Sequence, residues 1–115
     1  MNPNDLNPMT FSIHDLEQRL NERATASAEE SYTRKLLDRG VAHCAKKLGE
    51  EAIETVIAAA SEDRDRLIAE SADLVYHLLV VLMARDIKFA EIEAVLAART
   101  RQSGLEEKAS RLPGV

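Results

Sequence analysis

The fold of this chain is decided by the stretch Lys47-Leu48-Gly49-Glu50-Glu51-Ala52-Ile53-Glu54, which is followed fifteen residues later by Glu70-Ser71-Ala72-Asp73. Both segments have helical periodicity, and residues three apart on a helix stand on one face. Glu51 therefore projects with Glu54, and Glu70 projects with Asp73. If the two helices pack antiparallel, four carboxylates converge. Four like charges are tolerable at close range only with a cation among them, so the pattern predicts a metal site.

The composition predicts a single all-α domain. The chain has 115 residues, of which 45% are hydrophobic, 30% charged and only 3% aromatic. Abundant Ala, Leu and Glu favour helices, whereas β-branched and aromatic residues favour sheets. A domain of this size buries a modest core. We therefore expect an antiparallel helical bundle that is completed by homodimerisation.

Charge and cysteine content exclude several classes of function. The net charge is −5, and Lys and Arg are scattered rather than gathered on the basic face that nucleic-acid binding needs. The single cysteine, Cys44, permits no internal disulfide and is expected as a small buried hydrophobe. The polar N-terminus lacks a signal peptide, and the apolar run at 74–83 falls short of the roughly 20 residues that span a bilayer. We expect a soluble cytoplasmic protein that binds neither nucleic acid nor membrane.

Local signals place the helices within one helical domain at 11–100, between a flexible tail at 1–10 and a polar segment at 101–115. Ser12 is a candidate N-cap for the first helix, the S-x-x-E box at Ser27 could open a short second helix, and Gly40 should end it. Asp63 or Ser61 can cap the helix after the acidic stretch. The longer helices are expected at 41–60, 64–85 and 89–99, and the first two are antiparallel neighbours because their connection is short.

The helix at 41–60 has two distinct arcs. The apolar arc predicts its core side and consists of Val41, Ala45, Leu48, Ala52 and Val56. The other arc carries the acidic residues and Lys47. A glycine inside a helix costs roughly 1 kcal/mol against Ala, so Gly49 indicates close packing against the backbone unless it is simply tolerated.

The acidic residues also allow a simpler interpretation. Glu50, Glu51 and Glu54 can form a solvated face on which Lys47 pairs with carboxylates one turn away. Asp73 is harder to explain in this way, because it borders the most hydrophobic run, where a charge without a partner is costly. Taken together, the two motifs favour metal binding.

The ligand set selects the kind of metal. Ligands that are all oxygen favour Mg²⁺, or Mn²⁺, and the usual work of Mg²⁺ is to bind phosphates. Lys47, on the same helical face as the carboxylates, would complement a phosphate oxygen. His77 follows Asp73 by one turn, and we expect it in the core or beside the ligands more than as a ligand itself.

Four stretches of the chain resemble the phosphoribosyl-ATP pyrophosphatase family of histidine biosynthesis. The acidic pattern alone would indicate only the broader all-α, MazG-like nucleotide pyrophosphatase superfamily, and the first and last stretches are the specific ones. The four are Ser31-Tyr32-Thr33, Lys46-Lys47-Leu48-Gly49-Glu50-Glu51-Ala52-Ile53-Glu54, Glu70-Ser71-Ala72-Asp73-Leu74-Val75-Tyr76-His77 and Ser103-Gly104-Leu105-Glu106-Glu107-Lys108-Ala109-Ser110-Arg111.

The resemblance implies a dimeric helical enzyme that takes a small nucleotide. Its members hydrolyse phosphoribosyl-ATP to phosphoribosyl-AMP and pyrophosphate, the second step of histidine biosynthesis. The implied catalytic residues are Glu50 and the four Mg²⁺ ligands Glu51, Glu54, Glu70 and Asp73. Glu50 would act beside the ligands or orient water. The implied substrate contacts, which include the polar C-terminal segment, are Ser31, Thr33, Lys35, Lys47, Ser103, Lys108 and Arg111.

Two other functions remain open at this stage. One is a house-cleaning pyrophosphatase of the same superfamily that removes aberrant nucleoside triphosphates. The other is a helical dimerisation module without catalysis, whose acidic faces are only solvated. The sequence leaves open the number of Mg²⁺ ions, the group that activates water, and whether one subunit completes the site of another.

Overall fold

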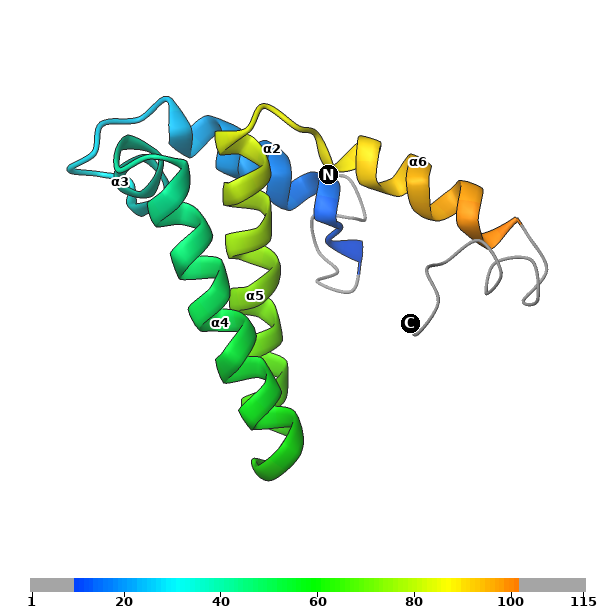
Figure 1. The fold of residues 1–115 in the computed structure, drawn as a ribbon. Helices are drawn as coiled ribbons and strands as arrows, with labels where there is room; N and C mark the ends of the chain where they lie inside the picture. The colour runs from blue at the N-terminus through cyan, green and yellow to red at the C-terminus, as the bar shows by residue number, and fades with distance from the viewer. Residues whose placement is uncertain (1–9, 102–115) are drawn as a thin grey trace.

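A computed structural model describes residues 10–101, and this part of the chain is all-α, as predicted. The expected N-terminal tail, apart from Thr10, and the segment at 102–115 lie outside the described residues. The helices, drawn in Figure 1, are α2 (Ile13–Ala24), α3 (Tyr32–Asp38), α4 (Val41–Ser61), α5 (Arg64–Ala84) and α6 (Phe89–Thr100). The bounds of α4, α5 and α6 agree closely with the predicted ones.

Polar caps set where the helices begin. The Ser12 hydroxyl accepts from the Asp15 amide at 3.2 Å, and Asp63 accepts from the Arg66 amide at 2.9 Å, so both predicted caps are confirmed. The prediction for Ser27 was wrong. Its carbonyl closes a turn by accepting from the amides of residues 30 and 31, and Ser31 caps α3 instead by accepting from the Arg34 amide at 3.2 Å.

Gly40 separates α3 from α4, as predicted. Its φ of 94° lies in the region that L side chains rarely adopt, so a glycine is needed for the chain to turn between the two helices. The tight corner brings the end of α3 against the beginning of α4. Side chains from both helices therefore line one pocket at this corner.

Helices α4 and α5 form a long antiparallel hairpin, joined by Glu62 and Asp63 (Figure 1). One face of α4 carries a row of buried or half-buried side chains. They recur every four and three residues in alternation, which is the spacing of one helical face. They include Cys44, Leu48, Glu51, Thr55 and Ala58.

The predicted core side of α4 was therefore wrong in part. Val41 is 38% exposed and Val56 is 66% exposed, and the buried face lies about a quarter of a turn away from the predicted arc. The periodicity identified an apolar face, but it could not tell which neighbour covers that face. Gly49 is also exposed, and a Cβ built on it would meet nothing within 4 Å among the described residues.

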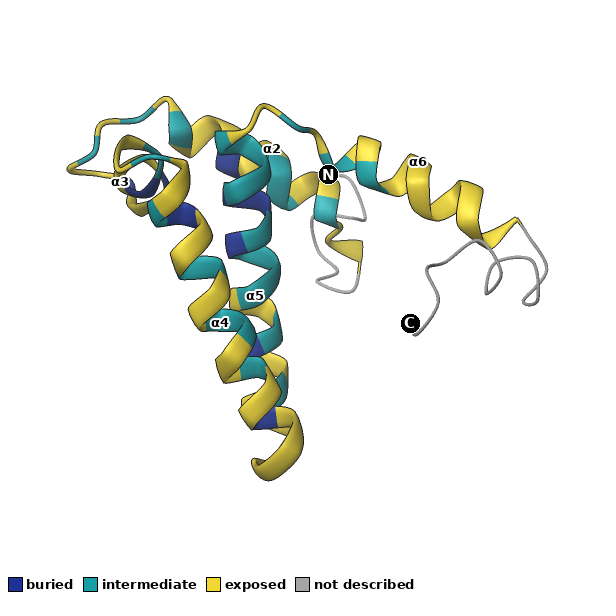
Figure 2. Cartoon of the chain, viewed as in Figure 1, coloured by how far each residue is buried: buried dark blue, intermediate teal, exposed yellow. Residues whose placement is uncertain are grey.

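The main core lies at the end of the hairpin that meets α2 and α3. It contains Leu20, Leu36, Cys44, Leu79 and Val80. The Cys44 thiol donates to the Leu36 carbonyl at 3.2 Å, so its predicted role as a small buried side chain is confirmed. Figure 2 shows that the far end of the hairpin and most of α6 are exposed.

Helix α5 is long and apolar enough, by length and composition alone, to cross a membrane, with a mean hydropathy of 1.7. Core helices of soluble proteins can have the same length and hydropathy. Within the described chain α5 supplies Leu79 and Val80 to the core and also carries the buried polar residues Glu70 and His77. Helix α5 therefore contributes both to the core and to the polar region of the hairpin.

Candidate metal centre and the adjoining basic pocket

Three carboxylates from the hairpin meet halfway along it. Glu51 comes from α4, Glu70 and Asp73 come from α5, and each offers an oxygen such that the three atoms all lie within 4.8 Å of one another. One buried oxygen of Glu51 and one of Glu70 have no hydrogen-bond partner within residues 10–101. We call these residues, together with Glu54, the carboxylate cluster.

Glu54 lies beside the other three but outside the group of mutually close oxygens. It is exposed, whereas Glu51, one turn earlier on α4, is half-buried against α5. Burial raises the pKa of Glu70. A hydrogen bond with Glu54, and the negative charges of Glu54 and Asp73, raise this pKa further. The Arg66 guanidinium, 2.5 Å from Glu70, opposes that rise. The described chain therefore holds more negative charge here than its own cations neutralise.

The structure changes the reason for singling out Asp73. The sequence suggested that Asp73 would be costly without a partner, but Asp73 is exposed. The buried carboxylate is Glu70, which is only 5% exposed. Hydrophobic neighbours along a helix lie on other faces, so adjacency in sequence does not report burial.

A divalent cation fits these residues. The donors are carboxylate oxygens, which are the ligands that Mg²⁺ and Mn²⁺ prefer. Buried oxygens without partners are costly, and a bound cation would satisfy them. The rim of exposed Glu54 and Asp73 leaves one side of the cluster open to a ligand from solution.

His77 lies behind the cluster, one turn beyond Asp73. Its Nε2 is 3.9 Å from the nearer oxygen of Glu51, and it is not one of the three mutually close donors. Burial, and then the charge of Lys47, lower its pKa, which favours the neutral imidazole. The ring packs edge-on against Tyr76, with ring centroids 5.0 Å apart. His77 thus supports the wall of the site.

Ser31 and Thr33, two of the residues implied as substrate contacts, are buried. Ser31 caps α3, and the Thr33 hydroxyl is hydrogen-bonded to the Tyr76 hydroxyl at 2.7 Å. Tyr32, between them in sequence, stacks on Tyr76 at a centroid distance of 6.4 Å. These contacts attach α3 to the part of α5 that carries the carboxylates. Substrate binding by Ser31 and Thr33 stays a prediction.

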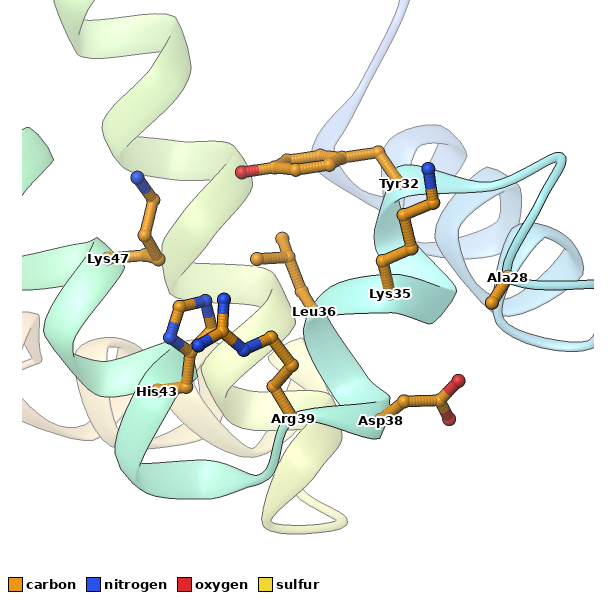
Figure 3. Close-up of a pocket in the computed structure, with 8 residues that line it drawn as sticks. All are labelled: Ala28, Tyr32, Lys35, Leu36, Asp38, Arg39, His43 and Lys47. Carbon is orange, nitrogen blue, oxygen red and sulfur yellow. The ribbon is translucent and has the colours of Figure 1, made fainter.

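A pocket of about 470 Å³ opens between α3 and α4 (Figure 3). Its cationic and titratable lining comes from Lys35, Arg39, His43 and Lys47, and we call it the basic pocket. The other lining residues are Ala28, Tyr32, Leu36 and Asp38. Of the predicted substrate contacts, Lys35 and Lys47 therefore lie here, whereas Ser103, Lys108 and Arg111 lie outside the described residues.

Lys47 connects the two regions. It lines the basic pocket and lies one helical turn before Glu51. Its ammonium pairs with Glu50 at 3.1 Å, as the simpler interpretation of the acidic stretch proposed, while Glu51 takes part in the cluster instead. Hydrogen bonding to Lys47 lowers the pKa of Glu50.

Sequence reasoning missed several residues that shape these regions. Tyr76 is recognisable only through its tertiary contact with Thr33, whereas Arg66 lies one helical turn before Glu70, a spacing that the sequence shows. Arg39 and His43 did leave a signal, because basic or titratable residues recur at every fourth position from Lys35 to Lys47. The glycine between α3 and α4 hid this spacing by interrupting the helix.

Comparison with known proteins assigns the chain to a family. The family model described as phosphoribosyl-ATP pyrophosphohydrolase matches residues 13–100. A Bradyrhizobium diazoefficiens protein named phosphoribosyl-ATP pyrophosphatase 1 is 65% identical over 101 residues, which cover 88% of this chain and 95% of the relative. Phosphoribosyl-ATP pyrophosphatases of Nitrobacter hamburgensis and Rhizobium meliloti are 60% and 54% identical, each over 88% of this chain and 94% of the relative. The chain belongs to the phosphoribosyl-ATP pyrophosphohydrolase family.

Proposed function

We propose that this protein hydrolyses phosphoribosyl-ATP to phosphoribosyl-AMP and pyrophosphate, the second step of histidine biosynthesis, in the cytoplasm. One observation carries the proposal beyond family membership. Oxygens of Glu51, Glu70 and Asp73 lie within 4.8 Å of one another in a chain whose relatives are named for this reaction. A cluster of this kind suits the cleavage of a phosphoanhydride, in which negative charge must be neutralised.

The carboxylate cluster would hold Mg²⁺, with Mn²⁺ as a substitute. Glu51 and Glu70 would supply buried oxygens, and Glu54 and Asp73 would complete the ligands from the rim. When bound, the cation would neutralise charge on the triphosphate oxygens and act as a Lewis acid. Arg66 holds Glu70 in place through their ion pair.

The other residues of the site position the substrate. Lys47 lies one turn from Glu51 and would contact a phosphate oxygen. Glu50 pairs with Lys47 and would hold its ammonium in place beside the ligands. The exposed carboxylates at the rim are placed to orient the attacking water. Such transfers depend on positioning and charge stabilisation, so no covalent nucleophile is needed.

Further substrate contacts are proposed on both sides of the site. Lys35 lines the basic pocket, while Ser31 and Thr33 would act near the anchored start of α3. Ser103, Lys108 and Arg111, in the polar C-terminal segment, would complete binding. The helical domain at 11–100 would thus hold the catalytic residues, and the C-terminal segment would contribute substrate contacts.

The protein would act as a homodimer. On α4, Ile53 is 63% exposed and Val56 is 66% exposed, and Ile68 on α5 is also exposed. These side chains, with the open backbone at Gly49, give an apolar face that a second copy would cover. Sedimentation should find a dimer, and Ile53→Asp should shift it toward monomer. A monomeric wild-type protein at micromolar concentration would contradict this part of the proposal.

The decisive experiment compares substrates. Purified protein with Mg²⁺ should turn over phosphoribosyl-ATP with a kcat/KM at least about a hundredfold above that for canonical and modified nucleoside triphosphates. Product analysis should find pyrophosphate rather than orthophosphate. A clear preference for modified triphosphates would favour the house-cleaning activity, and no turnover of any of them would favour the dimerisation module.

A further inference from the structure

The basic pocket carries positive charge that the described chain does not neutralise. Neither Lys35 nor Arg39 forms an ion pair within residues 10–101. Asp38, the acidic residue in the lining, is paired with Arg34 at 2.8 Å, and Figure 3 shows its carboxylate directed away from His43 and Lys47. Lys47 is paired with Glu50 at 3.1 Å, so within residues 10–101 the lining cations without an acidic partner are Lys35 and Arg39.

Two further features favour an anion in the pocket. Helix α4 begins between Arg39 and His43, and no side chain of the described residues caps its first amides. The positive end of a 21-residue helix therefore lies at the same corner. Burial and the charges of Arg39, Lys46 and Lys47 lower the pKa of His43, as expected for an imidazole in a positive potential.

The pocket is too far from the carboxylate cluster to hold the same phosphate. Glu51 follows His43 by eight residues on one helix, which corresponds to about 12 Å along the axis. Arg39 lies further away, beyond the start of α4. A phosphate held among Lys35, Arg39 and His43 must therefore be separate from the one at the cluster, and Lys47 lies between the two positions.

The ring of Tyr32 lies between the basic pocket and the residues that pack beside the carboxylate cluster. Tyr32 is 54% exposed, lines the basic pocket, and stacks on Tyr76 next to His77. An exposed aromatic face beside two phosphate-binding regions suits a sugar or a base. Phosphoribosyl-ATP has this chemistry, since it carries a triphosphate at one end and a ribose phosphate at the other.

We propose that the basic pocket binds the monophosphate of the phosphoribosyl group, with Lys35 and Arg39 as its main contacts, and so distinguishes phosphoribosyl-ATP from ATP. The inference rests on the proposed function and adds a second anchor to it. The triphosphate lies at the carboxylate cluster, and the monophosphate lies at the corner between α3 and α4. ATP, which lacks the second anchor, gains nothing from the pocket.

The test uses Lys35→Met, Arg39→Met and the double variant, each of which removes an exposed charge. Arg99→Met is the matched control, because Arg99 is an exposed cation on α6 that does not line the pocket. Steady-state kinetics are measured on phosphoribosyl-ATP, with ATP as a substrate or competitive inhibitor. Calorimetric titration with ribose 5-phosphate measures monophosphate binding directly, and circular dichroism checks the fold of each variant.

We expect the double variant to raise KM for phosphoribosyl-ATP at least about tenfold, with kcat changed less than about twofold and ATP unaffected, because charged hydrogen bonds to a phosphate are lost. Ribose 5-phosphate binding should weaken in parallel, and Arg99→Met should behave like wild type. Equal losses for phosphoribosyl-ATP and ATP would overturn the inference, since the pocket would then hold the triphosphate. A wild-type protein that does not turn over phosphoribosyl-ATP would instead defeat the proposed function itself.

Discussion

The carboxylate cluster and the basic pocket lie on either side of Lys47, and they differ in how their charge is held. The cluster is built from two long helices packed along their length, and two of its oxygens are buried without partners. The basic pocket lies at an open corner between a short helix and the start of α4, where its cations extend toward solvent.

This difference indicates what each region requires. Buried like charges destabilise the cluster, and the proposed cation would relieve this repulsion and become part of its structure. Exposed cations cost the fold little, and in the proposed function they would attract and position an anion. Changes in the cluster should therefore affect stability and the chemical step together, whereas changes in the pocket should affect mainly substrate affinity.

The largest effect is expected for Glu70→Gln. This substitution removes a buried oxygen of the proposed metal site, and it should lower kcat/KM at least about a hundredfold and abolish Mg²⁺ binding measured by calorimetry. Asp65→Asn is the matched control, because Asp65 is exposed on the same helix and is not among the clustered carboxylates. Unchanged Mg²⁺ affinity in Glu70→Gln would mean that the cluster is not the metal site.

The next effect concerns the contact that attaches α3 to α5. Tyr76→Phe removes the hydroxyl that is hydrogen-bonded to Thr33 at 2.7 Å and leaves the Thr33 hydroxyl, which is 1% exposed, without that partner. The free energy of unfolding, measured with urea, should fall by about 1–3 kcal/mol. Mg²⁺ affinity should change little, because the clustered oxygens are untouched. If Mg²⁺ affinity fell as far as in Glu70→Gln, the two regions could not be treated as separate.

A pH effect should follow from the raised pKa of Glu70. A carboxyl whose pKa is higher in the folded than in the unfolded protein stabilises the fold below its unfolded pKa, and this stability is lost as pH rises through the folded pKa. The metal-free protein should therefore gain thermal stability between neutral and mildly acidic pH. Comparing the wild type with Glu70→Gln isolates this contribution, since the other groups titrate in both. Saturating Mg²⁺ at neutral pH should also stabilise the wild type. An identical pH dependence of stability in the wild type and Glu70→Gln would contradict the assignment of this effect to Glu70.

The smallest effect is expected for Glu50→Gln. Glu50 is exposed and pairs with Lys47, and its oxygens are not among the three that converge. The substitution should reduce kcat/KM by about tenfold or less, and its thermal melting curve should match that of the wild type. A loss as large as that of Glu70→Gln, with Mg²⁺ affinity intact, would instead give Glu50 a direct part in activating water.

Much of the fold could be predicted because its signals are local. The caps Ser12 and Asp63, the stop at Gly40 and the 3.6-residue periodicity each depend on neighbours within one turn. The acidic spacing likewise fixed which carboxylates share a helical face. The prediction at Ser27 was wrong because the Ser27 carbonyl closes a turn before the helix. Ser31, four residues later, is the N-cap of α3 instead.

The sequence by itself determined the helices, the short connection that makes α4 and α5 antiparallel, and the pairing of acidic residues along each helix. Only the tertiary structure decided that Glu70 is buried while Asp73 is exposed, and that Val56 faces outward. The reason is physical: periodicity fixes angles around one helix axis, but burial and charge pairing depend on how neighbouring helices are rotated against each other. The basic pocket has the same origin, since the corner at Gly40 brings together two helices that the sequence presents one after the other.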